Sequence, residues 1–270
     1  MKTVETIADV RAALAPFRGG RSIGLVPTMG AFHEGHLSLI RVARGENDVV
    51  VVSLFVNPTQ FGDSGDLAAY PRDPERDARL GEEAGVDLLF VPPATEMYPQ
   101  GFQTWVEVEE LSKGMEGDAR PGHFRGVATV CLKLFNIVRP NRAYFGQKDA
   151  QQAALVERLV RDLDLDLEIR VLPTIRDADG LALSSRNVRL SPEERRAALA
   201  LPRALRAGED AYREGANADA VARVVLAGES GMEIDYVEVA RLNGRLVLAA
   251  AVRAGRTRLI DNVVLEGDPK

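Results

Sequence analysis

The sequence predicts an α/β protein in which a doubly wound parallel sheet is followed by a smaller α+β domain with an antiparallel sheet. Through residue 173, short apolar runs alternate with stretches whose apolar residues recur at helical spacing, as in parallel sheets with helical crossovers. The valine-rich run 48–56 does not alternate with polar residues, as expected for a central strand covered on both faces. Beyond Pro173, helical stretches precede three successive strand-like runs, which indicate a separate antiparallel unit.

Periodicity and turn residues locate the elements of the first part. Strands are predicted at 22–26, 48–56, 86–91, 143–145 and 167–172, and helices at 4–16, from 37 onward, and at 75–84, 127–138 and 150–163. The alternating run 102–108 is compatible with one more strand. Residues 113–126 read as a long glycine-rich loop, a kind of loop that is usually functional or disordered. We assign residues 1–174 to this Rossmann-like domain.

The second part begins after a polar hinge at 174–187. Ser191, Pro192 and Glu194 then form a strong helix start, with serine at the N-cap, proline at the first helical position and glutamate completing a capping box. Helices are predicted from there to about residue 214 and over 218–226, and strands at 233–240, 245–252 and 257–264. We assign residues 175–270 to the smaller α+β domain.

Composition and charge exclude several classes of protein. The 270 residues are 46% hydrophobic and carry a net charge of −6, which argues against a nucleic-acid partner because such a surface needs a basic face. No apolar run approaches the roughly 20 residues of a membrane span, and the first residues lack the apolar core of a signal peptide. The single cysteine, Cys131, is expected in the core and cannot form an internal disulfide, which fits a cytoplasmic protein.

Two histidines mark the first candidate site. His33 and His36 follow a predicted buried strand and a turn with Pro27 and Gly30, and they stand where a helix begins. Sheets of this type bind ligands at that position, and the free N–H groups of the helix attract phosphate. Because the histidines are three residues apart, a helix would place both on one face. The two imidazoles beside this helix N-terminus therefore predict a cradle for the phosphates of a nucleotide.

Three other interpretations of this turn stay open from the residues alone. Local hydrogen bonds could simply satisfy both histidines. A zinc site would need the pattern His-Glu-x-x-His, whereas the chain has His-Glu-Gly-His, and a third ligand would have to be a carboxylate. Gly30 and Gly35 match a dinucleotide-binding fingerprint only in part, because the G-x-G-x-x-G order is absent.

Three further polar segments are expected at the same edge of the sheet. They are residues 57–60, 146–152 and 184–186. Lys148 supplies a point charge and Arg186 a planar fork for phosphates, although exposure to solvent is the commoner state of a single lysine or arginine. Gln60 and Gln152 can hydrogen-bond hydroxyl and carboxylate groups of a small substrate without adding charge. Together these side chains favour nucleotidyl transfer, in which the protein positions an anion and neutralises the departing pyrophosphate.

Six stretches resemble one enzyme family and come in that family's order. They are residues 27–39, 55–61, 70–72, 120–127, 146–149 and 179–187. The His-x-Gly-His turn alone is similar to a whole nucleotidyltransferase superfamily, whereas the Asn-Pro-Thr-Gln loop and the Ser-Ser-Arg hinge resemble those of pantothenate synthetases. Residues beyond 187 carry no stretch that we can match to the family.

The resemblance implies an ATP-dependent condensation of (R)-pantoate with β-alanine, which gives pantothenate, AMP and pyrophosphate on the route to coenzyme A. In this family the pantoate carboxylate attacks the α-phosphate of ATP, and the β-alanine amine then attacks the enzyme-bound pantoyl adenylate. The resemblance also implies Mg²⁺ bound with ATP, a cytoplasmic homodimer, and a C-terminal domain that closes as a lid. No protein ligand of the metal is assigned.

The resemblance further implies roles for individual residues. His33, His36, Lys148 and Arg186 are expected to be catalytic, with His36 donating a hydrogen bond and a proton to the phosphates. The expected ATP site comprises Met29, Gly30, His33, Gly35, His36, Gly146, Gln147, Lys148, Asp149, Ile175, Leu183, Ser184, Ser185 and Arg186. Gln60 and Gln152 are expected to bind pantoate, and Gln60 also β-alanine.

Two positions depart from the family pattern. Phe32 stands where leucine is usual, a change that a core position tolerates. Gly65 precedes Asp66 where many members have glutamate, so no role is assigned to an acidic pair in that loop.

Two rival functions remain open. A small adenylyltransferase that joins AMP to a phosphorylated substrate would share the histidine turn but would need neither the Gln60 loop nor amine-dependent release of AMP. A non-catalytic nucleotide-binding module would leave the many polar positions unexplained. The identity of the released product, AMP or only pyrophosphate, distinguishes these functions.

Overall fold

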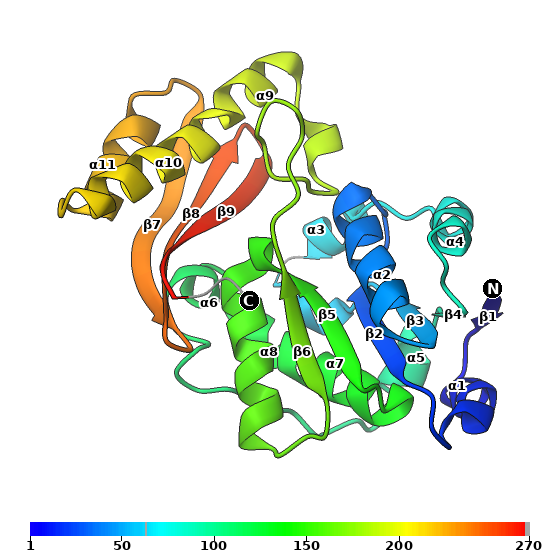
Figure 1. The fold of residues 1–270 in the computed structure, drawn as a ribbon. Coiled ribbons are helices and arrows are strands. Elements are labelled where there is room, and N and C mark those ends of the chain that lie inside the picture. Colours follow the sequence, from blue (N-terminus) through cyan, green and yellow to red (C-terminus); the bar gives the residue numbers. More distant parts are fainter. Residues whose placement is uncertain (63, 268–270) are drawn as a thin grey trace.

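The structure is a computed structural model that describes residues 1–62 and 64–267 and contains two sheets (Figure 1). The first sheet has six parallel strands in the order β1-β4-β3-β2-β5-β6. In that order they are Lys2–Val4, Leu88–Phe90, Val49–Leu54, Ile23–Thr28, Arg142–Gly146 and Glu168–Leu172. The second sheet is antiparallel and consists of β7 (Met232–Leu242), β8 (Arg245–Ala254) and β9 (Thr257–Glu266). The predicted fold class is confirmed.

The strand order of the first sheet contains a switch point between β2 and β5. From β2 the chain adds β3 and β4 on one side, and it later adds β5 and β6 on the other. Ligands bind at such a point, outside the carboxyl ends of the strands. The His-x-Gly-His turn follows β2 and the Gly-Gln-Lys-Asp turn follows β5, so the two segments lie on either side of this switch point.

Helices cover both faces of the first sheet. α2 (Glu34–Glu46) and α4 (Pro74–Glu83) pack on one face, and α1 (Ile7–Leu14), α7 (His123–Val138) and α8 (Ala150–Asp162) pack on the other. Successive valines of β3 point alternately into these two cores. The valine run therefore lacks polar alternation because both of its faces are buried.

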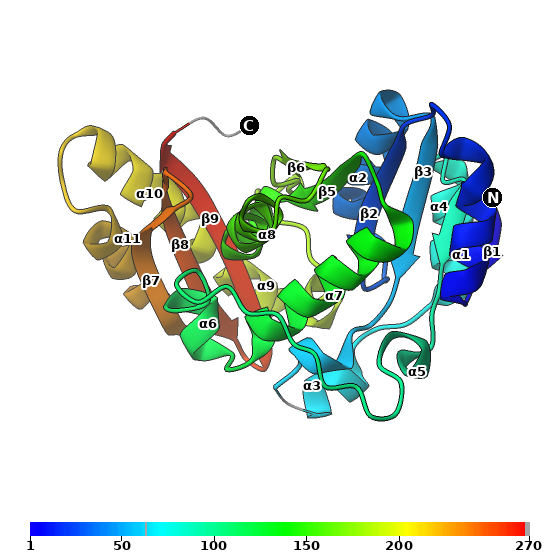
Figure 2. The same ribbon diagram turned by 90° about the horizontal axis from the view of Figure 1, so that it is seen from below.

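The second sheet lies beside the first and is also covered on both faces (Figure 2). α10 (Ala200–Arg213) and α11 (Ala218–Ala227) pack on one face, and α6 (Met115–Ala119) and α8 pack on the other. The predicted capping box begins α9 (Pro192–Ala198): the N–H of Glu194 donates to Ser191 Oγ at 3.1 Å, and the N–H of Ser191 donates to Glu194 Oε2 at 2.8 Å.

Short elements complete the fold. They are the helices α3 (Ser64–Ala69) and α5 (Ala94–Met97) and the 3₁₀ turns η1 (Ala15–Phe17), η2 (Pro58–Gln60), η3 (Gln147–Asp149) and η4 (Asn187–Arg189). Among the described residues, no helix is both long and apolar enough to cross a membrane.

Three sequence predictions were wrong, in addition to the start of α2 that is described with the site below. The helix expected over 4–16 begins at Ile7, because Thr6 caps it and Lys2–Val4 instead pairs with β4. Residues 102–108 form no strand; the N–H of Val106 donates to Thr129 Oγ1 of α7 at 3.0 Å instead of to a neighbouring strand. The glycine-rich loop at 113–126 contains α6 and the first turn of α7, which begins before the expected residue 127.

Candidate active site

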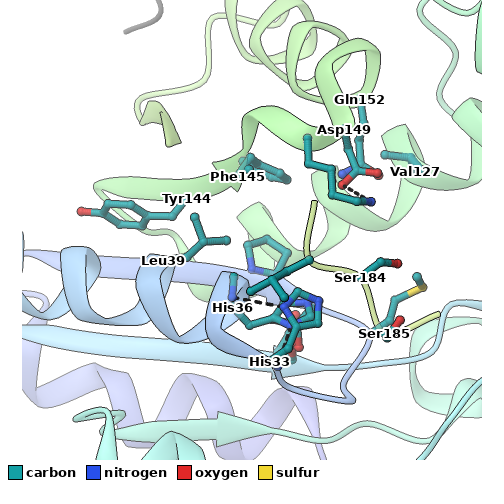
Figure 3. Close-up of a pocket in the computed structure, with 18 of the residues that line it drawn as sticks. His33, His36, Leu39, Val127, Tyr144, Phe145, Asp149, Gln152, Ser184 and Ser185 are labelled. Carbon is teal, nitrogen blue, oxygen red and sulfur yellow. Dashed lines mark hydrogen bonds and ion pairs between the residues drawn. The ribbon is translucent and has the colours of Figure 1, made fainter. Parts of the chain in front are cut away.

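A cleft lies at the carboxyl ends of β2, β3 and β5 (Figure 3). Fourteen of the predicted site residues line it: Met29, His33, Gly35, His36, Gln60, Gly146, Lys148, Asp149, Gln152, Ile175, Leu183, Ser184, Ser185 and Arg186. Gly30 and Gln147 are outside this lining. The side chain of Gln147 faces the second sheet instead, where its Nε2 donates to Asn262 Oδ1 at 3.0 Å.

His33 and His36 form a local pair at the start of α2. The helix begins at Glu34, three residues before the predicted start, so His33 is its N-cap and only His36 is helical. The N–H of Gly35 donates to His33 Nδ1 at 3.1 Å, the N–H of His33 donates to His36 Nδ1 at 3.4 Å, and the ring centroids are 4.2 Å apart. Because each Nδ1 accepts, the hydrogen-bond network assigns the proton of each neutral ring to Nε2. Local bonds therefore satisfy one nitrogen of each ring and leave the other as a donor.

Both histidines are neutral at pH 7. Burial and the charge of Lys148 lower the pKa of His33 from 6.5 to about 4. Burial, followed by the neighbouring His33 and Lys148, lowers the pKa of His36 to about 3. At pH 7 the Nε2–H of His36 is therefore a neutral hydrogen-bond donor and not part of an imidazolium.

The buried Asp77 of α4 holds the turn between β2 and α2. Its two carboxylate oxygens each accept a backbone hydrogen bond of 2.7 Å, from the N–H groups of Ala31 and Phe32, and its side chain is 1% exposed. The turn needs this support because Gly30 (φ 87°) and Ala31 (φ 53°) both lie in the left-handed region. Asp77 was not among the predicted site residues; a charged residue on the apolar face of an otherwise ordinary helix was the available signal.

Intramolecular hydrogen bonds also hold the loop that carries Gln60. Asn57 Nδ2 donates to Gln60 Oε1 at 3.0 Å and to the carbonyl of Gly126 at 3.2 Å. The carbonyl of Gln60 accepts from His123 Nδ1 at 2.9 Å. Asn57 therefore holds the side-chain amide of Gln60 and His123 holds its backbone, at a position that is only 7% exposed.

The two predicted cations have different surroundings. Lys148 Nζ lies 4.0 Å from Asp149 Oδ2, and Asn262 fixes the backbone of this turn by donating to the carbonyl of Lys148 at 2.9 Å. Arg186 Nη2 donates to Asp66 Oδ2 at 2.9 Å. Asp66 had no predicted role, yet an anion that binds the Nη2 group of Arg186 competes with this carboxylate.

The lining of the cleft also has an apolar wall on α7. Val127, Val130, Cys131 and Leu134 contribute it. Burial raises the pKa of Cys131 to about 12, so its thiol stays protonated and is a poor nucleophile. This confirms Cys131 as a core residue.

Metal-binding side chains do not cluster in the described ranges. Within residues 1–62 and 64–267, no group of three or more His, Cys, Asp or Glu side chains is placed to hold a metal ion. Asp149 is the one carboxylate in the described lining of the cleft. The zinc interpretation of His33 and His36 therefore has no ligand set among these residues.

The neutral histidines predict a pH-dependent stability. His33, His36 and His123 have pKa values of about 4, 3 and 4 in the folded chain and about 6.5 when unfolded. The unfolded chain thus binds more protons below pH 6.5, so this stability is complete above pH 6.5 and is lost as the pH falls toward 4. We expect a loss of about 1 kcal/mol per histidine between pH 7 and 5.5. Urea midpoints at pH 7 and 5.5 measure this loss of stability. The loss should be smaller in the double variant His33→Gln/His36→Gln; an equal loss in the variant and the wild type would contradict the lowered pKa values of these histidines.

The strand order, the histidine turn at the switch point and the amides that line the same cleft define an α/β protein with a ligand-binding site at the carboxyl edge of a parallel sheet. A family model described as pantoate-beta-alanine ligase matches residues 2–264. A pantothenate synthetase from Moorella thermoacetica is 55% identical over 280 residues, which cover 98% of this chain and 99% of the relative. The chain belongs to the pantoate–β-alanine ligase family.

Solved structures agree with this membership. The pantothenate synthetase from Thermus thermophilus has a TM-score of 0.93 and 47% identity, with 99% of this chain and 100% of that chain covered. A pantoate–β-alanine ligase from Francisella tularensis, whose structure is described as complexed with beta-gamma ATP and beta-alanine, has a TM-score of 0.85 and 38% identity over the whole of both chains.

Proposed function

We propose that this ligase condenses (R)-pantoate with β-alanine through an enzyme-bound pantoyl adenylate and releases pyrophosphate and AMP. One observation carries the proposal: the phosphate-binding turn and the amides of Gln60 and Gln152 line the same cleft. A carboxylate held by the amides would therefore face a nucleotide held by the turn. The structure of the Francisella relative, described as complexed with beta-gamma ATP and beta-alanine, supports the same pair of ligands.

In the first step, a carboxylate oxygen of pantoate forms a bond to the α-phosphorus of ATP. The bond from that phosphorus to the bridging oxygen breaks, and pyrophosphate leaves with the electron pair. Negative charge grows on the pyrophosphate oxygens, where the Nε2–H donors of His33 and His36 and the Lys148 ammonium stabilise it. Arg186 joins them when the triphosphate displaces Asp66.

Pantoate has a polar end and two methyl groups, and the cleft has a matching surface for each. Gln60 and Gln152 offer amides to its hydroxyl and carboxylate groups. Val127, Val130 and Leu134 offer an apolar wall to the methyl groups.

In the second step, the amine of β-alanine attacks the acyl carbon of the adenylate. A C–N bond forms, the bond from the acyl carbon to the AMP oxygen breaks, the nitrogen loses a proton, and AMP leaves. Gln60 is proposed to hold β-alanine in this step. The buried, doubly anchored position of Gln60 suits the orientation of both substrates.

Mg²⁺ is proposed to enter with ATP. Magnesium usually keeps several waters and binds one or two carboxylates together with substrate phosphates, so a single carboxylate, Asp149, is a sufficient protein contribution. The ion supplies charge neutralisation for the triphosphate.

The remaining expectations concern the hinge, the assembly and the compartment. The carbonyl of Ile175 accepts a hydrogen bond from the N–H of Leu183 at 2.9 Å, so the N–H of Ile175 is the backbone group proposed to contact adenine. Residues 183–186 and the domain after residue 174 are proposed to close over the cleft as a lid. Trp105 is 41% exposed in the segment 102–108, which belongs to no helix or strand, and such an exposed aromatic side chain suits the proposed homodimer. The one cysteine, buried and unpaired by disulfide, suits the cytoplasm.

The proposal is tested by pantoate-dependent exchange of label between ATP and pyrophosphate in the absence of β-alanine. Reversible adenylation predicts exchange only when (R)-pantoate is present. Absence of exchange at saturating pantoate, from a preparation that binds ATP, would overturn the adenylate intermediate.

Gly126→Ala is expected to weaken pantoate binding. A Cβ at this position would lie 2.6 Å from the carbonyl oxygen of Thr59 and 2.8 Å from the nitrogen of Gln60, so the loop that presents the Gln60 amide must shift. We expect the pantoate KM to rise about tenfold or more and the ATP KM to change little. Gly45→Ala, at an exposed position outside the lining of the cleft where a Cβ meets no atom within 4 Å, is the steric comparison; equal pantoate KM values for the two variants would contradict the prediction.

A further inference from the structure

A second, small cavity separates the active-site cleft from the C-terminal sheet. Its volume is about 30 Å³, and it is lined by Glu116 and Arg120, by Lys148 and Gln152 of the cleft, and by Tyr236 of β7. Figure 2 shows α6, which carries Glu116, beside the C-terminal sheet and just before α7. The side chains around this cavity therefore belong to both parts of the molecule.

Glu116 is the charged centre of this junction. Arg258 of β9 donates to it through both terminal nitrogens, Nη1 to Oε2 at 2.8 Å and Nη2 to Oε1 at 2.7 Å. Tyr236 donates its hydroxyl hydrogen to Oε1 at 3.0 Å. Glu116 is only 7% exposed; burial opposes its ionisation, but the hydrogen bonds and charge of Arg258 outweigh burial and lower its pKa. The second sheet thus holds a buried, ionised carboxylate in a fixed orientation.

On its other side, Glu116 connects to the backbone of Gln60. Arg120 Nη1 lies 3.8 Å from Glu116 Oε2, and Arg120 Nη2 donates to the carbonyl of Gln60 at 3.3 Å. Arg120 Nη1 also lies 3.3 Å from His123 Nε2, while His123 Nδ1 donates to the same carbonyl at 2.9 Å. Because burial keeps the ring of His123 neutral, with a pKa of about 4, one nitrogen donates to Gln60 and the other accepts from Arg120.

We propose that Glu116 is a positioning residue through which the C-terminal sheet sets the orientation of Gln60 for its substrates. This inference rests on the proposed function, since it assumes that Gln60 contacts pantoate. Among the described residues, only Glu116 accepts from both terminal nitrogens of Arg258. Glu116 also forms an ion pair with the Arg120 guanidinium, whose charge it favours. Removing its charge while keeping its shape frees Arg120, so the carbonyl of Gln60 loses one of its two donors.

The test compares Glu116→Gln with Arg241→Gln. Arg241 forms an exposed ion pair with Glu266 on the same sheet, at 3.3 Å, and contacts none of the junction residues. We expect Glu116→Gln to raise the pantoate KM about tenfold while the ATP KM stays within twofold, and Arg241→Gln to change neither. Arg258→Lys keeps the positive charge but loses the planar fork, so its pantoate KM is expected to lie between those of the wild type and Glu116→Gln. The double variant Glu116→Gln/Arg258→Lys should have a pantoate KM no higher than that of Glu116→Gln alone.

A second measurement reads the position of the Gln60 loop without substrate. The backbone amide signals of Thr59 and Gln60 in a ¹H–¹⁵N spectrum should shift in Glu116→Gln and stay in place in Arg241→Gln. Unmoved signals together with an unchanged pantoate KM would overturn the inference, as would equal rises of the pantoate and ATP KM values, which indicate a merely structural role. If wild type lacked pantoate-dependent exchange, the proposed function would fail, and the amide signals would still decide whether Glu116 positions Gln60.

Discussion

Lys148→Ala lowers the rate of pantoate-dependent ATP–pyrophosphate exchange by about 10²–10³-fold and leaves the affinity for pantoate almost unchanged; this is the expected result with the largest effect. The reason is that the ammonium of Lys148 stabilises charge that appears on pyrophosphate only in the transition state. Asn262 holds the backbone of this turn, so the substitution should not displace its neighbours. Isotope exchange gives the rate, and calorimetry gives the affinity.

The control for this variant is Lys113→Ala. Lys113 is 66% exposed and pairs with Glu110 at 2.7 Å, away from the cleft, so its loss should leave the exchange rate at the wild-type value. Exchange that persists at the wild-type rate in Lys148→Ala would remove this lysine from the adenylation step.

Asp77→Ala is expected to combine the largest loss of stability with a loss of activity. The change leaves the N–H groups of Ala31 and Phe32 without their charged acceptor, in a turn whose backbone is left-handed at two positions. We expect the free energy of unfolding to fall by about 2–4 kcal/mol. Because the turn positions His33 and His36, kcat should fall about tenfold or more under conditions where the variant is folded.

Two comparisons make this result specific. Asp77→Asn keeps one acceptor oxygen and should lie between wild type and Asp77→Ala in both urea midpoint and kcat. Glu75→Ala, at an exposed position of the same helix, should change neither. A wild-type kcat in folded Asp77→Ala would show that the histidine pair keeps its geometry without this carboxylate.

Local patterns in the sequence were enough for five of the six parallel strands, and the resemblance to the family supplied most of the residues that line the cleft. The valine run predicted a strand buried on both faces, and Ser191 and Glu194 predicted a capping box that the structure contains. The His-x-Gly-His turn lies at the switch point because β2 happens to stand at the reversal of the strand order. Periodicity cannot show that order, since it reports one element at a time.

The contacts that sequence reasoning missed all join distant segments. Asp77 lies 46 positions after Ala31, Asp66 lies 120 positions before Arg186, and Glu116 lies 142 positions before Arg258. Each is a buried or half-buried carboxylate whose partner only the fold brings near. The false strand at 102–108 has a related cause: its alternating apolar residues pack against α7 and not into a ladder, and alternation alone does not distinguish the two.

The central claim is that one cleft performs adenylation followed by amide formation. The most direct test is the release of AMP by the purified enzyme with ATP, Mg²⁺ and (R)-pantoate, with and without β-alanine. Steady AMP release that requires β-alanine is the predicted result and excludes both a simple adenylyltransferase and a non-catalytic nucleotide-binding module. Pyrophosphate without AMP turnover in either case would contradict amide ligation and would leave only the nucleotidyl-transfer step.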